Sequence, residues 1–108
     1  MALTMTIQHH WMDTKKIHVL ATVIATGVYT TGGDILTMKN TEIKSDSSPE
    51  FTLFQGLSGY GYRYVPGTNR TNGKLKVFLA GTEIGAGAYP AAVLADIISF
   101  YGIFRMFL

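Results

Sequence analysis

Three histidines, His9, His10 and His18, are the side chains best suited to hold a metal ion, apart from seven Asp and Glu residues. His9 and His10 are consecutive in a stretch that alternates like a strand, so their rings point to opposite faces and cannot share one ion. His10 and His18 can become neighbours across two strands, but two imidazoles without a nearby carboxylate make a poor metal site. We therefore expect no metal ion and regard these histidines as strand residues at a polar interface.

The candidates for a catalytic nucleophile are three serines in a polar loop beside Asp46 and Glu50, namely Ser45, Ser47 and Ser48. No Gly-x-Ser-x-Gly sequence is present to hold a serine on a strand-to-helix turn. The chain has no cysteine, which excludes disulfides, thiolate nucleophiles and cysteine-bound zinc. Gly85 and Gly87 lack the third glycine and the following helix of a dinucleotide-binding loop. We expect no enzyme activity and no cofactor.

A row of tyrosines, Tyr60, Tyr62 and Tyr64, recurs at every second residue and therefore lies on one face of a strand. Such a row can stack bases in a protein that binds single-stranded nucleic acid, or it can pack between strands. The net charge is only +2, and the nine Lys and Arg residues are scattered along the chain. This is too weak a positive field for a nucleic-acid binder, so we expect packing and no nucleic acid. A small β-barrel that binds single strands remains the alternative from another functional class.

The elements that would position these residues are strands. Alternating or apolar runs bounded by turn residues predict about seven of them, at 3–11, 16–26, 35–38, 51–55, 59–65, 74–79 and 97–107. We expect Leu3, Met5, Ile7, His9 and Trp11 to share one face of the first strand. Residues 83–96 are expected to form an ordered loop with one short helical turn at 91–95. The pattern is typical of an all-β fold, a single antiparallel β-sandwich or jelly-roll-like domain over residues 1–108.

Scarcity of charge is the most informative feature of the composition. Charged residues make up 15% of the 108 residues and hydrophobic ones 47%, whereas roughly a quarter of a typical soluble domain is charged. A small domain with few charges exposes apolar or neutral surface, which usually contacts a partner. Residues 84–104 are apolar apart from Asp96, but Pro90 and several glycines favour a strand–loop–strand arrangement, so we expect no membrane span. The first residues lack a basic region followed by an apolar core, so we expect synthesis in the cytoplasm without secretion.

Five segments together resemble a known group of proteins. They are residues 31–34 (TGGD), 59–67 (GYGYRYVPG), 72–77 (NGKLKV), 86–92 (AGAYPAA) and 96–104 (DIISFYGIF). Their order and the total length resemble the small virion proteins of tailed bacteriophages that decorate, or cement, the capsid. The resemblance covers most of the chain from about residue 27 onward and includes no catalytic signature.

The resemblance implies a compact β domain that binds the major capsid protein on the capsid exterior and stabilises the head, assembled in the host cytoplasm. Such proteins often form homotrimers at local three-fold axes. Residues 1–11 would then be a strand or an arm that engages neighbouring chains. We expect contacts with other chains at Leu3, Met5, Ile7, Arg70, Phe107 and Leu108. A structural subunit of the phage tail or neck is the closest alternative.

Overall fold

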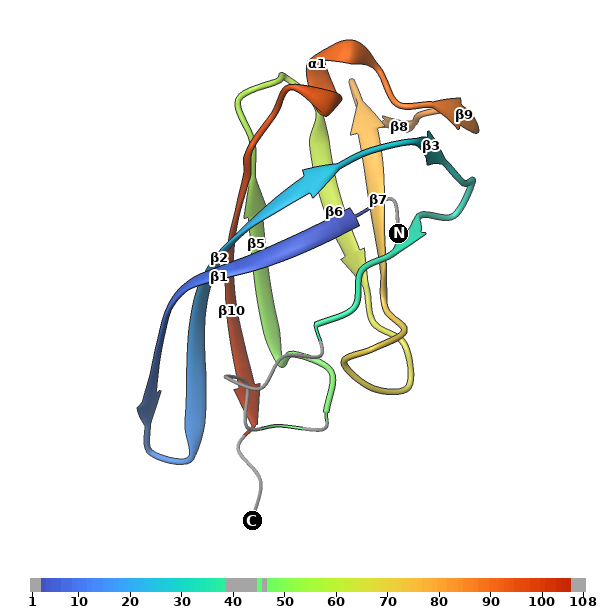
Figure 1. Ribbon diagram of the computed structural model, residues 1–108. Coiled ribbons are helices and arrows are strands. Elements are labelled where there is room, and N and C mark those ends of the chain that lie inside the picture. The colour runs from blue at the N-terminus through green and yellow to red at the C-terminus, as the bar shows by residue number, and fades with distance from the viewer. Residues whose placement is uncertain (1–2, 39–44, 46, 106–108) are drawn as a thin grey trace.

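A computed structural model gives the fold and describes residues 3–38, 45 and 47–105. Two antiparallel sheets pack on each other (Figure 1). The large sheet contains, in spatial order, β1 (Leu3–Asp13), β2 (Lys16–Ala25), β10 (Ile98–Arg105) and β5 (Phe51–Gln55). The small sheet contains β4 (Asp34–Ile35), β7 (Lys74–Leu79) and β6 (Gly61–Val65), with β8 (Thr82–Glu83) also paired to β7. A two-stranded ribbon of β3 (Val28–Tyr29) and β9 (Gly87–Ala88), followed by α1 (Ala91–Leu94), lies at one end.

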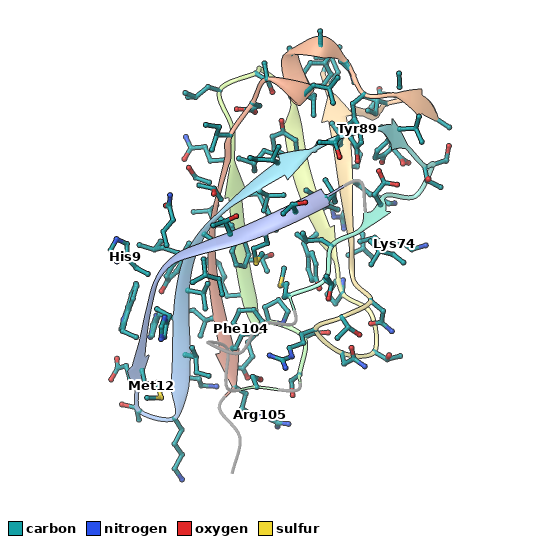
Figure 2. All side chains as sticks on the ribbon, in the orientation of Figure 1. His9, Met12, Lys74, Tyr89, Phe104 and Arg105 are labelled. Carbon is teal, nitrogen blue, oxygen red and sulfur yellow. The ribbon has the colours of Figure 1, made fainter. Side chains whose placement is uncertain are left out.

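The core lies between the two sheets and is built from strictly alternating strands. On β2 the buried residues are Ile17, Val19, Ala21, Val23 and Ala25. On β10 they are Ile98, Phe100, Gly102 and Phe104. For β10 this is the nearly all-apolar face that the alternating sequence predicts to be internal, whereas for β2 the sequence left either face as a candidate. Figure 2 shows Phe104 inside the molecule, while Arg105, the next residue, lies at its lower edge.

The all-β prediction is confirmed, but the described residues contain ten strands rather than about seven. The additional strands β3, β8 and β9 have two residues each, which is too short for any alternation to be visible in a sequence. The strand expected at 35–38 is also shorter, since β4 ends at Ile35. The chain beyond it is held by single hydrogen bonds, in which Leu36 N–H donates to Gly73 O and Met38 N–H to Arg70 O. The helical turn expected at 91–95 is present as α1.

The hairpin of β1 and β2 contains an irregularity that decides which residues reach the surface. The register runs from Leu3 opposite Ala25 to Ile7 opposite Ala21, and then shifts so that His9 lies opposite Leu20. Gln8 is therefore the extra residue of a β-bulge. Before the bulge, Leu3, Met5 and Ile7 face the core; after it, His9 and Trp11 are on the outer face. The prediction that all five share one face is wrong, because one inserted residue reverses the alternation.

Residues 84–104, considered above as a membrane span, form a connection that contains β9 and α1, followed by most of β10. Among the residues that the structure describes, no helix has the length and apolar character needed to cross a membrane. The arm considered at residues 1–11 is, from Leu3 onward, the edge strand of the large sheet and pairs with β2 of the same chain.

Candidate protein-interaction surfaces

The histidines are not brought together. His10 lies opposite Val19, and His18 lies opposite Trp11, so His10 and His18 are not the cross-strand pair that we considered. His9 points outward from β1, as Figure 2 shows. Within the described ranges, no group of three or more His, Asp, Glu or Cys side chains could hold a metal ion.

The three serines hold loops together. Ser45 is buried, and its Oγ accepts a hydrogen bond from Ser47 N–H at 3.3 Å. Ser48 Oγ donates to Gly67 O at 3.3 Å, and Arg105 Nη2 donates to Ser47 Oγ at 3.4 Å. Asp46, their proposed acidic neighbour, lies outside the described residues. The contacts that are described are those of a structural loop.

The tyrosine row packs between the sheets. Tyr64 is buried and stacks on Phe54, with ring centroids 6.2 Å apart, while Tyr60 and Tyr62 are half-buried against the core. Burial raises the pKa of both Tyr62 and Tyr64 to about 12. All three rings therefore pack against the core, as the packing interpretation predicts.

Asp96 connects two loops at one end of the molecule. It is 7% exposed and accepts hydrogen bonds from Leu57 N–H at 3.0 Å and from the Tyr62 hydroxyl at 2.8 Å. Burial alone would raise the pKa of Asp96, but the hydrogen bonds from Leu57, Tyr62 and Ser58 outweigh it and lower the pKa. Gly56 makes the close approach feasible, because a Cβ there would lie 2.9 Å from Asp96 Cγ and closer still to Oδ2. Asp96 thus holds the loop that carries Leu57 in place.

Above Asp96 lies a small apolar surface, which we call the apolar tip. Its large side chains are Leu57, Leu94 and Ile97, which are 94%, 41% and 62% exposed. A shallow hollow of about 350 Å³ beside them is lined by Leu57, Ser58, Ala92, Ala95 and Asp96. The only carboxylate of this set is turned inward to its hydrogen bonds. Figure 1 shows the loop between β5 and β6 and helix α1 at the same end of the molecule.

The second surface is the outer face of the large sheet, which we call the outer face. It is formed by outward-pointing residues of four adjacent strands. Its apolar and aromatic part comprises Trp11, His18, Leu20, Phe51, Leu53, Tyr101 and Ile103. Trp11, Leu20, Phe51 and Leu53 are between 37% and 53% exposed. None of these seven residues is an acid, a lysine or an arginine.

Rings on the outer face stack on one another. The Trp11 and His18 rings are 5.0 Å apart and nearly parallel, and His18 and Tyr101 are 6.0 Å apart. His18 Nδ1 and the Tyr101 hydroxyl share a hydrogen bond of 2.6 Å, and Phe51 meets Tyr101 edge to face. Trp11 and Tyr101 are also only 6.3 Å apart, so the three rings form one mutually packed cluster. Such a set suits contact with another protein surface better than the stacking of bases.

Polar residues surround this apolar part. At the hairpin end, Lys16 forms an ion pair with Glu50, near Asp13 and Arg105. At the other end stand hydroxyl and amide side chains of adjacent strands, namely Thr6, Thr22, Ser99 and Gln55. Beyond Thr22 the outward face of β2 continues with Ile24, which is 43% exposed, so the polar border is interrupted there. An apolar centre bordered by polar residues is common in protein–protein interfaces.

The residues that we expected to contact other chains are placed differently from these surfaces. Leu3 is 2% exposed, and Met5 and Ile7 pack against the core, so their placement does not support that role. Arg70 is half-buried in the 66–73 loop, and its carbonyl receives Met38 N–H. Phe107 and Leu108 lie outside the described residues. The expectation for all six stays a prediction.

Sequence reasoning missed Leu57 and the outward turn of Trp11. Leu57 lies in a short Gly-Leu-Ser-Gly connection, where a single leucine gives no periodic signal. The bulge at Gln8 likewise leaves no mark in the alternation of residues 3–11. No protein-family model, curated protein or solved structure matches this chain.

Proposed function

We propose that this chain is a bacteriophage capsid decoration protein that binds the shell of major capsid protein through its apolar tip and stabilises the head. The observation that carries the proposal is Leu57, a large apolar side chain that is 94% exposed on a loop held by Asp96. The sequence resemblance described above supports the capsid as the partner. The low proportion of charged residues agrees with a chain that functions as part of an assembly.

A fixed, exposed leucine is an efficient anchor. Burying a leucine side chain contributes roughly 1.5–3 kcal/mol. Ordering a mobile loop on binding would cost part of that gain, but hydrogen bonds from Leu57 N–H and from Tyr62 to Asp96 have already ordered this loop. The small side chains of Ala92 and Ala95 allow a partner to approach the hollow closely.

Binding to particles that lack the decoration protein tests the proposal. We expect the natural chain to bind such particles and Leu57→Ser to bind at least about tenfold more weakly, which corresponds to about 1.4 kcal/mol. Ile35→Ser is the matched control, because Ile35 is 47% exposed on β4 and lies away from the tip. Equal binding by all three chains would contradict the role of the tip.

Cryo-electron microscopy of the parent particle tests the location. Density for the chain on the capsid exterior is expected, with the β5–β6 loop directed at the shell. Density in a tail tube or a neck ring of six or twelve copies would instead support the tail or neck alternative. The number of copies at each capsid position would be read from the same map, and three would support the homotrimer that the resemblance implies.

A further inference from the structure

We infer that the outer face of the large sheet packs against the same face of a second copy of this chain, forming a two-fold symmetric dimer. The inference concerns a surface on the side of the molecule and does not depend on the shell-binding role of the apolar tip. Three features of the outer face support a second copy as its occupant: its size, its charge and the geometry of the sheet.

The size of the face is close to what a stable dimer requires. The four strands β1, β2, β10 and β5 have 11, 10, 8 and 5 residues. With about 3.3 Å along the strand and about 4.8 Å across it for each residue, the plan area is on the order of 540 Å², before the relief of the side chains is counted. A standard interface buries about 800 Å² of accessible surface on each partner. The outer face alone therefore approaches the area of a specific interface.

The charge of the face permits contact between identical copies. Its centre holds no acid, lysine or arginine, and at its charged end Lys16 is paired with Glu50. Like charges placed opposite one another would oppose self-association. A two-fold axis that runs across the strands sets the charged end of one copy over the Thr22 and Ser99 end of the other, so no like charges meet.

The geometry of the sheet suits such packing. Two sheet faces stack with their strands aligned within about 30°, and side chains of both faces interdigitate in a layer about 10 Å thick. With the axis across the strands, β5 of one copy lies against β5 of the other. Phe51 of each copy then meets Leu53 of its partner copy. The stacked rings of Trp11, His18 and Tyr101 hold one another in place, which lowers the entropy lost on contact.

The test uses the purified full-length chain without any particle. Light scattering should give the mass of two copies, which dissociate on dilution. Trp11 is the only tryptophan and is 43% exposed on this face, so its fluorescence should shift to longer wavelength as the dimer dissociates. Leu53→Glu places an unpaired charge at the centre of the face and should weaken association at least about tenfold.

Ile35→Glu is the matched control, since it adds the same charge at an exposed leucine-sized residue of the small sheet and should remain dimeric. Far-ultraviolet circular dichroism confirms that both variants are folded. A mass of one copy at all concentrations, or of three copies, overturns the inference. A Leu53→Glu chain that dimerises as well as the natural one also overturns it. These measurements use no capsid particles, so their outcome does not depend on whether the shell-binding proposal is correct.

Discussion

The ring of Phe100 lies against the α-carbon of Gly102, two residues further along the inner face of β10. A Cβ atom on Gly102 would lie 2.9 Å from Cε2 of Phe100 and closer still to Cζ. Phe100 is 2% exposed and packs on Phe54, with ring centroids 4.8 Å apart, so its ring has little room to move. Gly102 is thus required by the close packing of an aromatic ring in the core.

We expect Gly102→Ala to lower the free energy of unfolding by about 1–3 kcal/mol, because the added methyl group overpacks the core. Urea denaturation followed by circular dichroism measures the effect. Gly85→Ala serves as the control, since a Cβ at Gly85 would meet nothing within 4 Å. A loss in Gly102→Ala no larger than in this control would show that Phe100 can move aside.

Asp96 should make the protein sensitive to acid. Its hydrogen bonds lower its pKa in the folded chain, so the folded state binds fewer protons than the unfolded state. The stability that Asp96 contributes is full above about pH 4 and is lost as the pH falls through the lowered pKa. We expect the thermal unfolding midpoint to fall in this range and to fall less in Asp96→Asn.

At neutral pH, Asp96→Asn should lower the free energy of unfolding by about 1–3 kcal/mol, because an amide cannot accept both hydrogen bonds. The loop that holds Leu57 should become more mobile, which hydrogen exchange of the Leu57 amide would detect. Identical acid profiles for the natural chain and Asp96→Asn would mean that another carboxylate controls the acid transition.

Four of the six tyrosines should ionise unusually late. Burial raises the pKa of Tyr29, Tyr62 and Tyr64 to about 12 and also raises that of Tyr89, whose hydroxyl donates to Asp34. The folded state therefore favours the neutral phenols. The stability they contribute is full below about pH 10 and is lost as the pH rises toward about 12.

Ultraviolet absorbance of the phenolate should accordingly show a late, cooperative phase that coincides with loss of the β-sheet signal in circular dichroism. Tyr29→Phe removes one group from that phase, along with the hydrogen bond of 2.6 Å from Tyr29 to Glu83. Ionisation of all six tyrosines in one ordinary step near pH 10 would contradict the burial of these rings.

Tyr64 offers a site at which removing an atom should stabilise the fold. Its hydroxyl is buried and has no hydrogen-bond partner among the described residues. It lies against Gly73, where a Cβ would collide with it. We expect Tyr64→Phe to raise the free energy of unfolding by about 1 kcal/mol, because the cost of the unpaired hydroxyl disappears. A loss of stability in urea denaturation would reveal an ordered water at this hydroxyl.

Alternation along the longer strands was enough to predict much of the fold. The inward residues of β10, the bounds of β5 and the hairpin of β6 and β7 follow from local pattern and turn residues. These features are predictable because the period of two and the turn signals depend only on neighbours in the chain. The two-residue strands β3 and β9 were not predicted, because they exist only through pairing with each other across distant parts of the chain, and β8 was not predicted because two residues next to β7 show no alternation.

The candidate surfaces depended on contacts that the sequence does not display. The amino-acid sequence by itself determined an all-β chain with few charges, and a core made of alternating residues. The tertiary structure decided that a bulge at Gln8 turns Trp11 outward to stack on His18, and that Asp96 reaches back 39 residues to hold Leu57 in the open. The first outcome depends on the register of the β1–β2 hairpin and the second on contact between segments 39 residues apart, and no local pattern of residue types records either.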